Sequence, residues 1–401
     1  MELTELKAAV CAAVDHLAAD SEAVSDWIFQ HPELGEEEYE SSAYLKAKIE
    51  ALGFQVEMPY GGLPTAFRAE YGDDDGPKVA FLAEYDALPG YGDLSPNGTG
   101  NGHACGHNWI AASTYAAAAA LKQVKEHFHG KIVWIGTPAE ETTGGKIDLC
   151  RAHCFDDLDA VFQFHLSGNA ANCLRPYELA CTDITYIFHG KSSHASNNPE
   201  DGVNALDACS LTMAGVNALR QHVRCDSRIH GIIKDGGLAC NVVPERSEMM
   251  YFVRAGKIDY LEQLIERVNN CARGAALMTG CEVEIVRGRN TFKDLRHNEA
   301  LIEAVRRNLE GLGITDFING DPYHTGSTDI GNVSYDAPTF YGTLTTISQG
   351  PGEPHDAIYL ERASSAYANS LLHIAAKAMA ESALDVFCDE ALRSRTQLTY
   401  K

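Results

Sequence analysis

The feature that most constrains the fold of this 401-residue chain is an alternation of strand-like and helix-like segments before residue 170. Short apolar runs bounded by Gly or Pro indicate strands, and longer stretches with helical spacing indicate helices. Strands that alternate with helices favour an α/β fold with a mostly parallel, doubly wound sheet. The expected strands are 54–60, 65–72, 77–88, 131–138 and 159–166, with helices within 5–50 and at 108–128.

The pattern changes near residue 181, where TDITYIFHGKS begins to alternate apolar and polar side chains as in an antiparallel strand with one wet face. The segments that follow predict a β-α-β-β-α layer, with a helix near 202–222, strands at 228–237 and 246–255, and a helix at 258–279. After about residue 290 the α/β alternation returns and ends in a long helix, 361–390. We therefore expect a catalytic domain made of 1–180 and 292–401, interrupted by an inserted α+β domain, 181–291.

The charge balance excludes some partners. With 32 basic and 56 acidic residues, the formal net charge is −24, which argues against nucleic acid or an anionic membrane as a ligand. The first twenty residues lack the pattern of a signal peptide, and no apolar run approaches the roughly eighteen residues of a membrane span. The twelve cysteines without an export signal predict reduced thiols and a cytoplasmic protein.

Titratable residues gather where the predicted strands end. Asp86 closes one strand in EYDALPG, Glu140 and Glu141 follow another in GTPAEE, and His165 closes a third in FHLSG. Because ligands of α/β sheets collect at the carboxyl ends of strands, we expect these side chains to meet. Cys105 and His107, in the glycine-flanked GHACGHN, complete a set of thiolate, imidazole and carboxylate donors. Such a set suits Zn²⁺, Mn²⁺ or Co²⁺.

The adjacent carboxylates of Glu140 and Glu141 point in different directions. One can bind a metal ion while the other takes a proton from water, as metal-assisted hydrolysis requires. Each residue also has a plainer interpretation, because a Glu pair is often a solvated turn, a lone His after a strand is often a core residue, and Asp86 could cap a turn. It is less probable that all the plainer interpretations hold together at several strand ends.

Six motifs appear in a familiar order: EYDALPG, GHACGHN, GTPAEE, FHLSG, GKSSHAS and NVVPERSEMMYFVRA. The chain resembles the metallopeptidases that include aminoacylase, carboxypeptidase G and hippurate hydrolase, and within them the amidohydrolase branch with a Cys ligand. GGKIDL, HGIIKDGG and GSTDIGNVS make it most similar to the p-aminobenzoyl-glutamate hydrolase and β-alanyl-lysine dipeptidase subgroup. Asn108 and Glu84, where much of the branch has Asp, fit this subgroup and weaken a transfer of substrate from hippurate or auxin-conjugate hydrolases.

The resemblance implies a centre of two divalent metal ions. Glu140 would be the general base and later the proton donor, and Asp86 would support the site. His324 in PYHTGSTD is a weaker alternative for the last of the ligands. The implied ligands are Cys105, His107, Glu141, His165 and His355.

The inserted domain would be, by the same resemblance, a lid and dimerisation domain. His194 would reach the active site of the partner subunit and stabilise the oxyanion, as a positioned imidazole can. Asn241 would hold the substrate's carbonyl, and Arg254 offers a planar fork for its carboxylate. Ser327 and Thr328 could add hydroxyl donors near the substrate.

These expectations describe a metal-dependent hydrolase, acting as a homodimer, that cleaves the amide bond of a dipeptide or of an N-acyl or aminobenzoyl amino acid. Two alternatives stay open at this point. One is an N-acyl-amino-acid deacylase, which differs in whether the acyl side carries an amino group. The other is a metal-binding or ligand-binding regulatory subunit without catalysis. A requirement for a second type of subunit also stays open.

Overall fold

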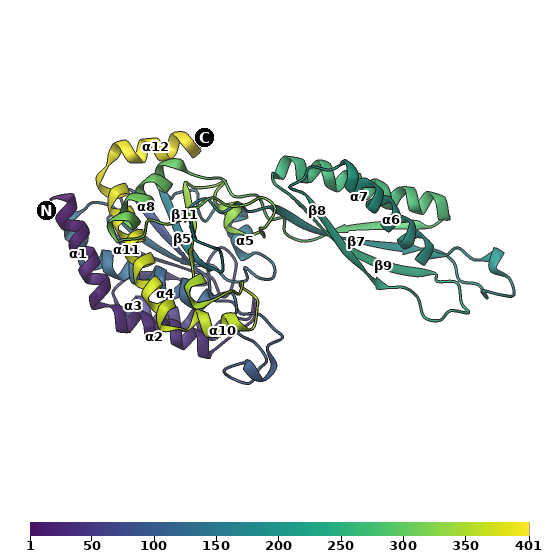
Figure 1. Cartoon of the computed structure of the whole chain (residues 1–401), viewed down its shortest axis with the longest axis horizontal. Helices are drawn as coiled ribbons and strands as arrows, with labels where there is room; N and C mark the ends of the chain where they lie inside the picture. Colours follow the sequence, from purple (N-terminus) through teal and green to yellow (C-terminus); the bar gives the residue numbers. More distant parts are fainter. Residues whose placement is uncertain (401) are drawn as a thin grey trace. The chain divides into compact units, whose positions relative to one another are not determined.

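The computed structural model describes residues 1–400 and divides the chain into two compact units (Figure 1). Unit 1 comprises Met1–Pro176, Arg296–Gly320 and Asn332–Lys401. Unit 2 comprises Tyr177–Leu295 and Asp321–Gly331. The segment 321–331 thus packs with unit 2, whereas the sequence pattern places it in the first domain; backbone hydrogen bonds such as Leu179 N to Gly326 O hold it there.

The centre of unit 1, within residues 1–400, is an eight-stranded sheet in the order β1-β2-β4-β3-β5-β12-β6-β11. β4, β3, β5 and β12 run parallel to one another, and β11 is parallel to β6, so the sheet is mostly parallel as predicted. The strands are β1 (Gln55–Glu57), β2 (Phe67–Gly72), β3 (Lys78–Ala83), β4 (Lys131–Gly136), β5 (Ala160–Ser167), β6 (Asn172–Cys173), β11 (Phe317–Ile318) and β12 (Thr339–Thr345).

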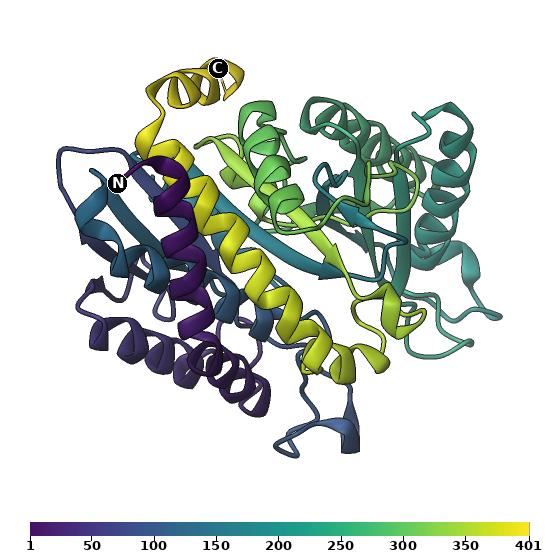
Figure 2. The same ribbon diagram turned by 60° about the vertical axis from the view of Figure 1, so that its left-hand side comes forward.

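Helices cover this sheet. The Ala-rich α4 is buried along almost its whole length, as expected of a helix that is apolar all round, and it packs against β3, β4 and β5. α1 and α11 lie side by side, and both pack against α4 (Figure 2). The helices are α1 (Leu3–His16), α2 (Ala18–Gln30), α3 (Tyr39–Ala51), α4 (His107–Gln123), α5 (Gly145–Arg151), α8 (Glu299–Gly311), α9 (Ile330–Val333), α10 (Ile358–Ala363), α11 (Ala366–Cys388) and α12 (Glu390–Tyr400).

Two predicted elements of unit 1 end elsewhere in the structure. The strand expected at 77–88 stops at Ala83, because the chain then leaves the sheet and Ala87 N donates to Glu33 O. The long helix expected at 361–390 is two helices, since Ser365 caps the start of α11 with its side chain on Ala368 N. The first difference places Glu84 and Asp86 at the sheet edge rather than within it.

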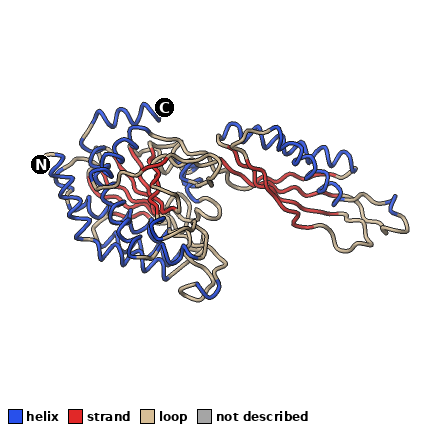
Figure 3. Tube along the Cα trace, in the orientation of Figure 1, coloured by secondary structure: helices blue, strands red, loops and turns tan. Residues whose placement is uncertain are grey.

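Unit 2 is an antiparallel sheet in the order β10-β7-β9-β8, with α6 and α7 on one face (Figure 3). In β9, Ser247, Met249, Tyr251 and Val253 are buried in strict alternation, so Arg254 lies on the face away from the helices. The sequence analysis does not predict β10, whose residues are all exposed or only partly buried. The elements are β7 (Ala180–His189), α6 (Ala205–Leu219), β8 (Arg228–Asp235), β9 (Arg246–Ala255), α7 (Ile258–Thr279) and β10 (Glu282–Arg287).

In the part of the chain that the structure describes, none of the helices has the length and apolarity needed to cross a membrane.

Candidate active site

Six of the predicted site residues converge at the carboxyl edge of the parallel strands. They form three overlapping groups, and within each group the donor atoms lie within 4.8 Å of one another. Because β3, β4 and β5 run in the same direction, the residues that end or follow them meet at one edge. The groups are Cys105 with His107 and His165, Cys105 with Glu141 and His355, and His107 with Glu140 and Glu141.

His107 is held by Asp86 in the orientation that a metal ligand needs. Its Nδ1 lies 2.8 Å from Asp86 Oδ1, and both side chains are buried. The other carboxylate oxygen of Asp86 accepts from the backbone N of Glu141 at 2.8 Å. The Nε2 atom of His107 is buried and makes no hydrogen bond, with carboxylate oxygens of Glu84 and Glu141 at 3.4 and 3.8 Å. A carboxylate–histidine pair with an unsatisfied second nitrogen fits a divalent metal ion.

His165 and Cys105 present the next pair of donors. His165 Nδ1 lies 2.5 Å from the carbonyl oxygen of Leu166, which leaves Nε2 as the acceptor, 3.4 Å from Cys105 Sγ. Burial raises the pKa of Cys105 well above its usual value, and Glu141 raises it further. A buried thiol of this kind ionises when a cation is close, which again fits a metal ion of Zn²⁺ type.

The structure places His355 beside these donors. His355 Nε2 lies 3.2 Å from Glu141 Oε1, and its backbone N donates to Ala104 O at 2.8 Å. Its φ of 77° is a left-handed conformation that non-glycine residues rarely adopt and that clusters at functional sites. His324 belongs to unit 2, where its side chain is 86% exposed and pairs with Asp321.

His194 and Asn241 lie together at one end of unit 2. His194 pairs with Val242 in an isolated antiparallel bridge, and Ala195 N donates to Asn241 O at 3.0 Å. The Nδ1 atom of His194 accepts from Asn197 N at 3.1 Å. This bond leaves the Nε2 atom of the exposed imidazole as the N–H donor, which is the form that can stabilise an oxyanion.

Arg254 lies at the opposite end of the same sheet. In the β7–β9 ladder Arg254 faces Cys181, whereas Arg246 faces His189, just before the His194 turn. From Arg246 to Arg254 the strand advances eight residues, which spans roughly 26 Å at about 3.3 Å per residue.

Two hydroxyl residues that the sequence singles out belong to the segment 321–331 of unit 2. The Ser327 hydroxyl accepts a 2.8 Å hydrogen bond from Arg254 Nη1. Thr328 is buried. Of the two, Ser327 is therefore the one placed to act together with Arg254.

Comparison with known proteins decides the family. The model of peptidase family M20/M25/M40 matches residues 80–377, which is most of the chain. The chain belongs to this peptidase family. It is accordingly a hydrolase of peptide or amide bonds, as the sequence pattern predicts.

Individual relatives agree with this M20 membership. The chain is 38% identical to the Xaa-Arg dipeptidase of Mus musculus over 100% of this chain and 93% of that protein. It is 36% identical to one of the p-aminobenzoyl-glutamate hydrolase proteins of Escherichia coli (strain K12) over 65% of this chain and 56% of that protein. A Bacillus subtilis structure, the YXEP protein, described as a dinuclear metal-binding peptidase of the M20 family, superposes with a TM-score of 0.72 at 21% identity, covering 93% and 99% of the two chains. The last likeness concerns the fold.

Three buried residues lie beside the donors of this M20 hydrolase and contact one another, which the sequence analysis does not predict. They are Glu84, Lys146 and Gln163. Glu84 Oε1 accepts from Lys146 Nζ at 2.6 Å and from Gln163 Nε2 at 2.8 Å. Burial would raise the pKa of Glu84, but Lys146, His107 and His165 outweigh it and lower the pKa to about 2. In the sequence, Lys146 follows a Gly-Gly turn that suits a solvated loop equally well, so nothing local marks it as fully buried.

Glu38 is a further residue without a sequence signal. Its Oε1 accepts from Ala139 N at 2.7 Å, and its Oε2 accepts from the Thr65 hydroxyl at 3.1 Å. Burial, and next the nearby Asp86, raise the pKa of Glu38 to about 8. Ala139 has a φ of 62° and directly precedes Glu140, so Glu38 fixes the strained turn that presents the Glu140–Glu141 pair.

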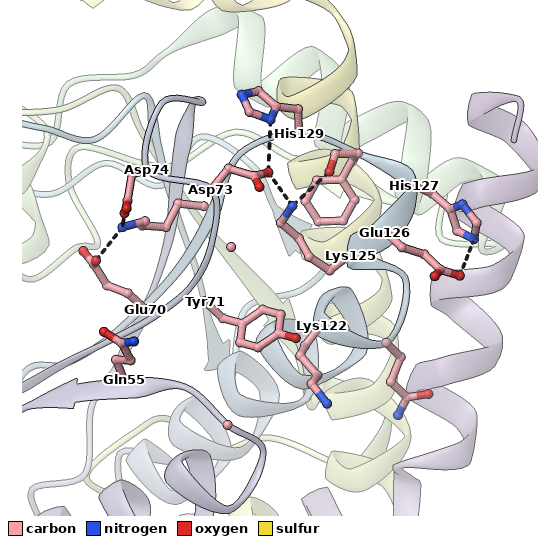
Figure 4. A pocket seen from close by; sticks show the side chains of 15 residues that line it. Gln55, Glu70, Tyr71, Asp73, Asp74, Lys122, Lys125, Glu126, His127 and His129 are labelled. Atoms are coloured by element: carbon pink, nitrogen blue, oxygen red, sulfur yellow. Dashed lines mark hydrogen bonds and ion pairs between the residues drawn. The ribbon is translucent and has the colours of Figure 1, made fainter.

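A large groove of about 1170 Å³ lies elsewhere on unit 1 (Figure 4). Its lining includes Lys131, the first residue of β4, so it lies at the amino edge of the parallel strands, away from the metal donors. Several of its charged groups pair with one another, as Asp73 does with Lys125 and Lys131 does with Asp74. None of the predicted site residues lines this groove.

Proposed function

We propose that this M20 hydrolase is a metal-dependent dipeptidase that cleaves the amide bond before a C-terminal basic residue. The observation that carries the proposal is the convergence of the donor groups around the buried, unsatisfied Nε2 of His107. The 38% identity to an Xaa-Arg dipeptidase over the whole chain supports the substrate class. The p-aminobenzoyl-glutamate relative supports a second candidate, hydrolysis of N-acyl or aminobenzoyl amino acids.

Cys105, His107, Glu141, His165 and His355 would hold two divalent ions, zinc or manganese, with cobalt as an alternative. Two ions are favoured because the donor groups overlap: Cys105, His107 and Glu141 each belong to two of the three groups. When bound, such ions polarise the scissile carbonyl and lower the pKa of water towards neutrality. Asp86 keeps His107 in the required tautomer.

Glu140 would act as the proton carrier. Its neighbour Glu141 is committed elsewhere, because its backbone N is bonded to Asp86 and its Oε1 lies 3.2 Å from His355. A carboxylate oxygen of Glu140 accepts a proton from the attacking water and later passes it to the leaving amine nitrogen, the role of a general base and acid.

Arg254 would anchor the free carboxylate of the substrate, with Ser327 orienting the guanidinium and Thr328 adding a hydroxyl. Asn241 lies beside His194 at the far end of the sheet, so it would hold the carbonyl of the substrate in the partner subunit. Replacing Arg254 by lysine or alanine is then expected to lower kcat/KM by about 10- to 100-fold, the loss typical of charge-assisted hydrogen bonds. Steady-state kinetics measures it. The same dipeptides with an amidated C-terminus should not distinguish Arg254→Ala from wild type, whereas equal losses on both substrates would refute the assignment. Arg287→Ala, which removes a surface ion pair with Glu262 in the same unit, is the matched control.

His194 would serve the active site of a second subunit. Within unit 2 roughly 26 Å of strand separates its turn from Arg254, whereas a dipeptide spans only about 7 Å. One substrate therefore cannot contact Arg254 and His194 of the same chain. A homodimer supplies the second copy, and β8 offers a surface for it, since it is an edge strand on which Ile232 is 65% exposed.

A substrate panel tests the proposed function. Purified protein loaded with Zn²⁺ or Mn²⁺ is assayed on β-alanyl and α-aminoacyl dipeptides ending in Arg, Lys, Orn or Glu, on p-aminobenzoyl-glutamate, and on N-acetyl and indole-3-acetyl amino acids. We expect cleavage of the dipeptides that end in a basic residue, and none by the Glu140→Gln variant. Cleavage restricted to p-aminobenzoyl-glutamate or the N-acyl compounds would replace the dipeptidase by the second candidate. Bound metal with no cleavage of any compound would contradict both.

A further inference from the structure

His107 lies between two buried carboxylates, of which only one has a role so far. Asp86 contacts Nδ1 at 2.8 Å, and Glu84 Oε2 lies 3.4 Å from Nε2. Glu84 and Asp86 are two residues apart in the extended segment that follows β3, so their side chains can reach the same imidazole. Glu84 is therefore aimed at the nitrogen that would bind a metal ion.

The orientation of Glu84 is fixed from the side away from His107. Lys146 and Gln163 both donate to its Oε1, which leaves Oε2 facing Nε2 of His107. Gln163 and His165 are two residues apart in β5 and so share a face of that strand. Lys146 is the second residue of α5, six residues after Glu140. The network thus draws one member each from the segment after β3, from α5 and from β5, and β5 also carries the candidate donor His165.

The charges in this network are unusual for an interior. The side chains of Lys146 and Glu84 are 0% and 1% exposed, and a buried ion is tolerated only when it is paired. The Glu84 carboxylate would attract a cation at His107, and the Lys146 ammonium would oppose that attraction. A structural ion pair could have formed anywhere in the core, whereas this one directs a carboxylate oxygen at a candidate ligand.

We propose that Glu84 and Lys146 set the charge at the metal-facing nitrogen of His107: Glu84 adds a negative charge there, and Lys146 is the positioning residue that holds Glu84 and offsets that charge. This inference rests on the proposed function, because it takes His107 as a metal ligand. An uncompensated negative charge makes a bound cation a weaker Lewis acid. Lys146 would therefore keep a bound metal ion a strong Lewis acid, and it would also lower the affinity of the site for that ion.

The proposal predicts metal affinities that change in opposite directions. Glu84→Gln leaves a buried ammonium near the site and should weaken Zn²⁺ binding by about tenfold or more. Lys146→Met leaves an uncompensated carboxylate that the metal itself can neutralise, and should tighten Zn²⁺ binding by about tenfold while slowing turnover. The double variant Glu84→Gln/Lys146→Met should return towards the wild-type affinity. Affinity is measured on metal-stripped protein by competition with a chromophoric chelator, with thermal unfolding recorded in parallel.

Lys131→Met is the matched control. Lys131 is also nearly buried and paired with two carboxylates, Glu70 and Asp74, but lies at the opposite edge of the sheet. This variant should lose stability with its Zn²⁺ affinity unchanged.

The outcomes separate the inference from the proposed function. A wild-type protein that binds no metal would refute the proposed function itself. Normal metal binding by wild type, with both single variants unchanged or both shifted in the same direction, would overturn only the role of Glu84 and Lys146. If Lys146→Met does not fold, the comparison of Glu84→Gln with the double variant decides, because removal of Lys146 must then restore affinity.

Discussion

The Glu140→Gln variant is expected to lose about 10²- to 10⁴-fold in kcat, the range typical of a general acid–base residue. Glutamine keeps the shape of the side chain but cannot accept a proton. Metal binding should persist, since the ligand set we propose does not include Glu140. The variant is measured by single-turnover kinetics on a dipeptide that the wild-type protein cleaves, with metal content determined by elemental analysis.

Two further measurements make the Glu140 result specific. Metal content and KM close to the wild-type values show that only the proton transfer has been lost. Glu36→Gln is a suitable control, because it neutralises a nearby carboxylate that accepts a hydrogen bond from Thr143 in the loop after Glu141. Near-normal turnover by Glu140→Gln would exclude this residue as the base. Loss of metal from it would instead make Glu140 a ligand.

The His194→Ala variant is expected to lose about 10²- to 10³-fold in kcat, as when one oxyanion donor is removed. If His194 serves the partner subunit, co-expression of His194→Ala with Glu140→Gln chains must restore activity. Half of the randomly assembled dimers are hybrids, and one site in each hybrid then has both Glu140 and His194 intact. The mixture should therefore reach roughly a quarter of the wild-type activity in a two-fold symmetric dimer.

The matched control for this experiment is a mixture of Glu140→Gln with Arg254→Ala chains. Both residues would act on the substrate of their own chain, so no hybrid site is complete and the mixture should show no more than the residual activity of the Arg254→Ala chains. Recovery in the first mixture and not in the second supports the shared site. An inactive first mixture, with hybrid dimers confirmed by two affinity tags, would show that His194 does not act on the partner's site.

Much of the fold could be predicted from local patterns. Alternating strands and helices predict the mostly parallel sheet because each strand needs a crossover to return in the same direction. The change to two-residue alternation near residue 181 predicts the antiparallel layer. One strand is not predicted: the alternation in β10 covers only Glu282–Ile285, and none of the residues of this strand is fully buried.

The chemical types of the donors in the candidate site could also be predicted. Strand ends and glycine-rich turns hold Cys105, Glu141 and His165. A polar side chain at such a position is not explained by packing of the hydrophobic core. Which histidine completes the set could not be decided locally, since His324 and His355 both follow turn-forming residues. The fold favours His355, because its backbone is bonded to Ala104 at the start of the site loop and its imidazole lies 3.2 Å from Glu141.

Periodicity and residue type were enough to predict the kind of sheet, the inserted layer and the chemical nature of the donors. Each of these features depends on the residues of a short stretch of the chain. Three features depended on the folded arrangement: Lys146 is buried against Glu84, Glu38 holds the turn before Glu140, and a whole strand separates His194 from Arg254. These are contacts or distances between residues far apart in the chain. A charged side chain in a glycine-rich turn has the same local sequence pattern whether it is solvated or paired with a buried partner. Whether it is buried therefore depends on which residues the rest of the fold places beside it.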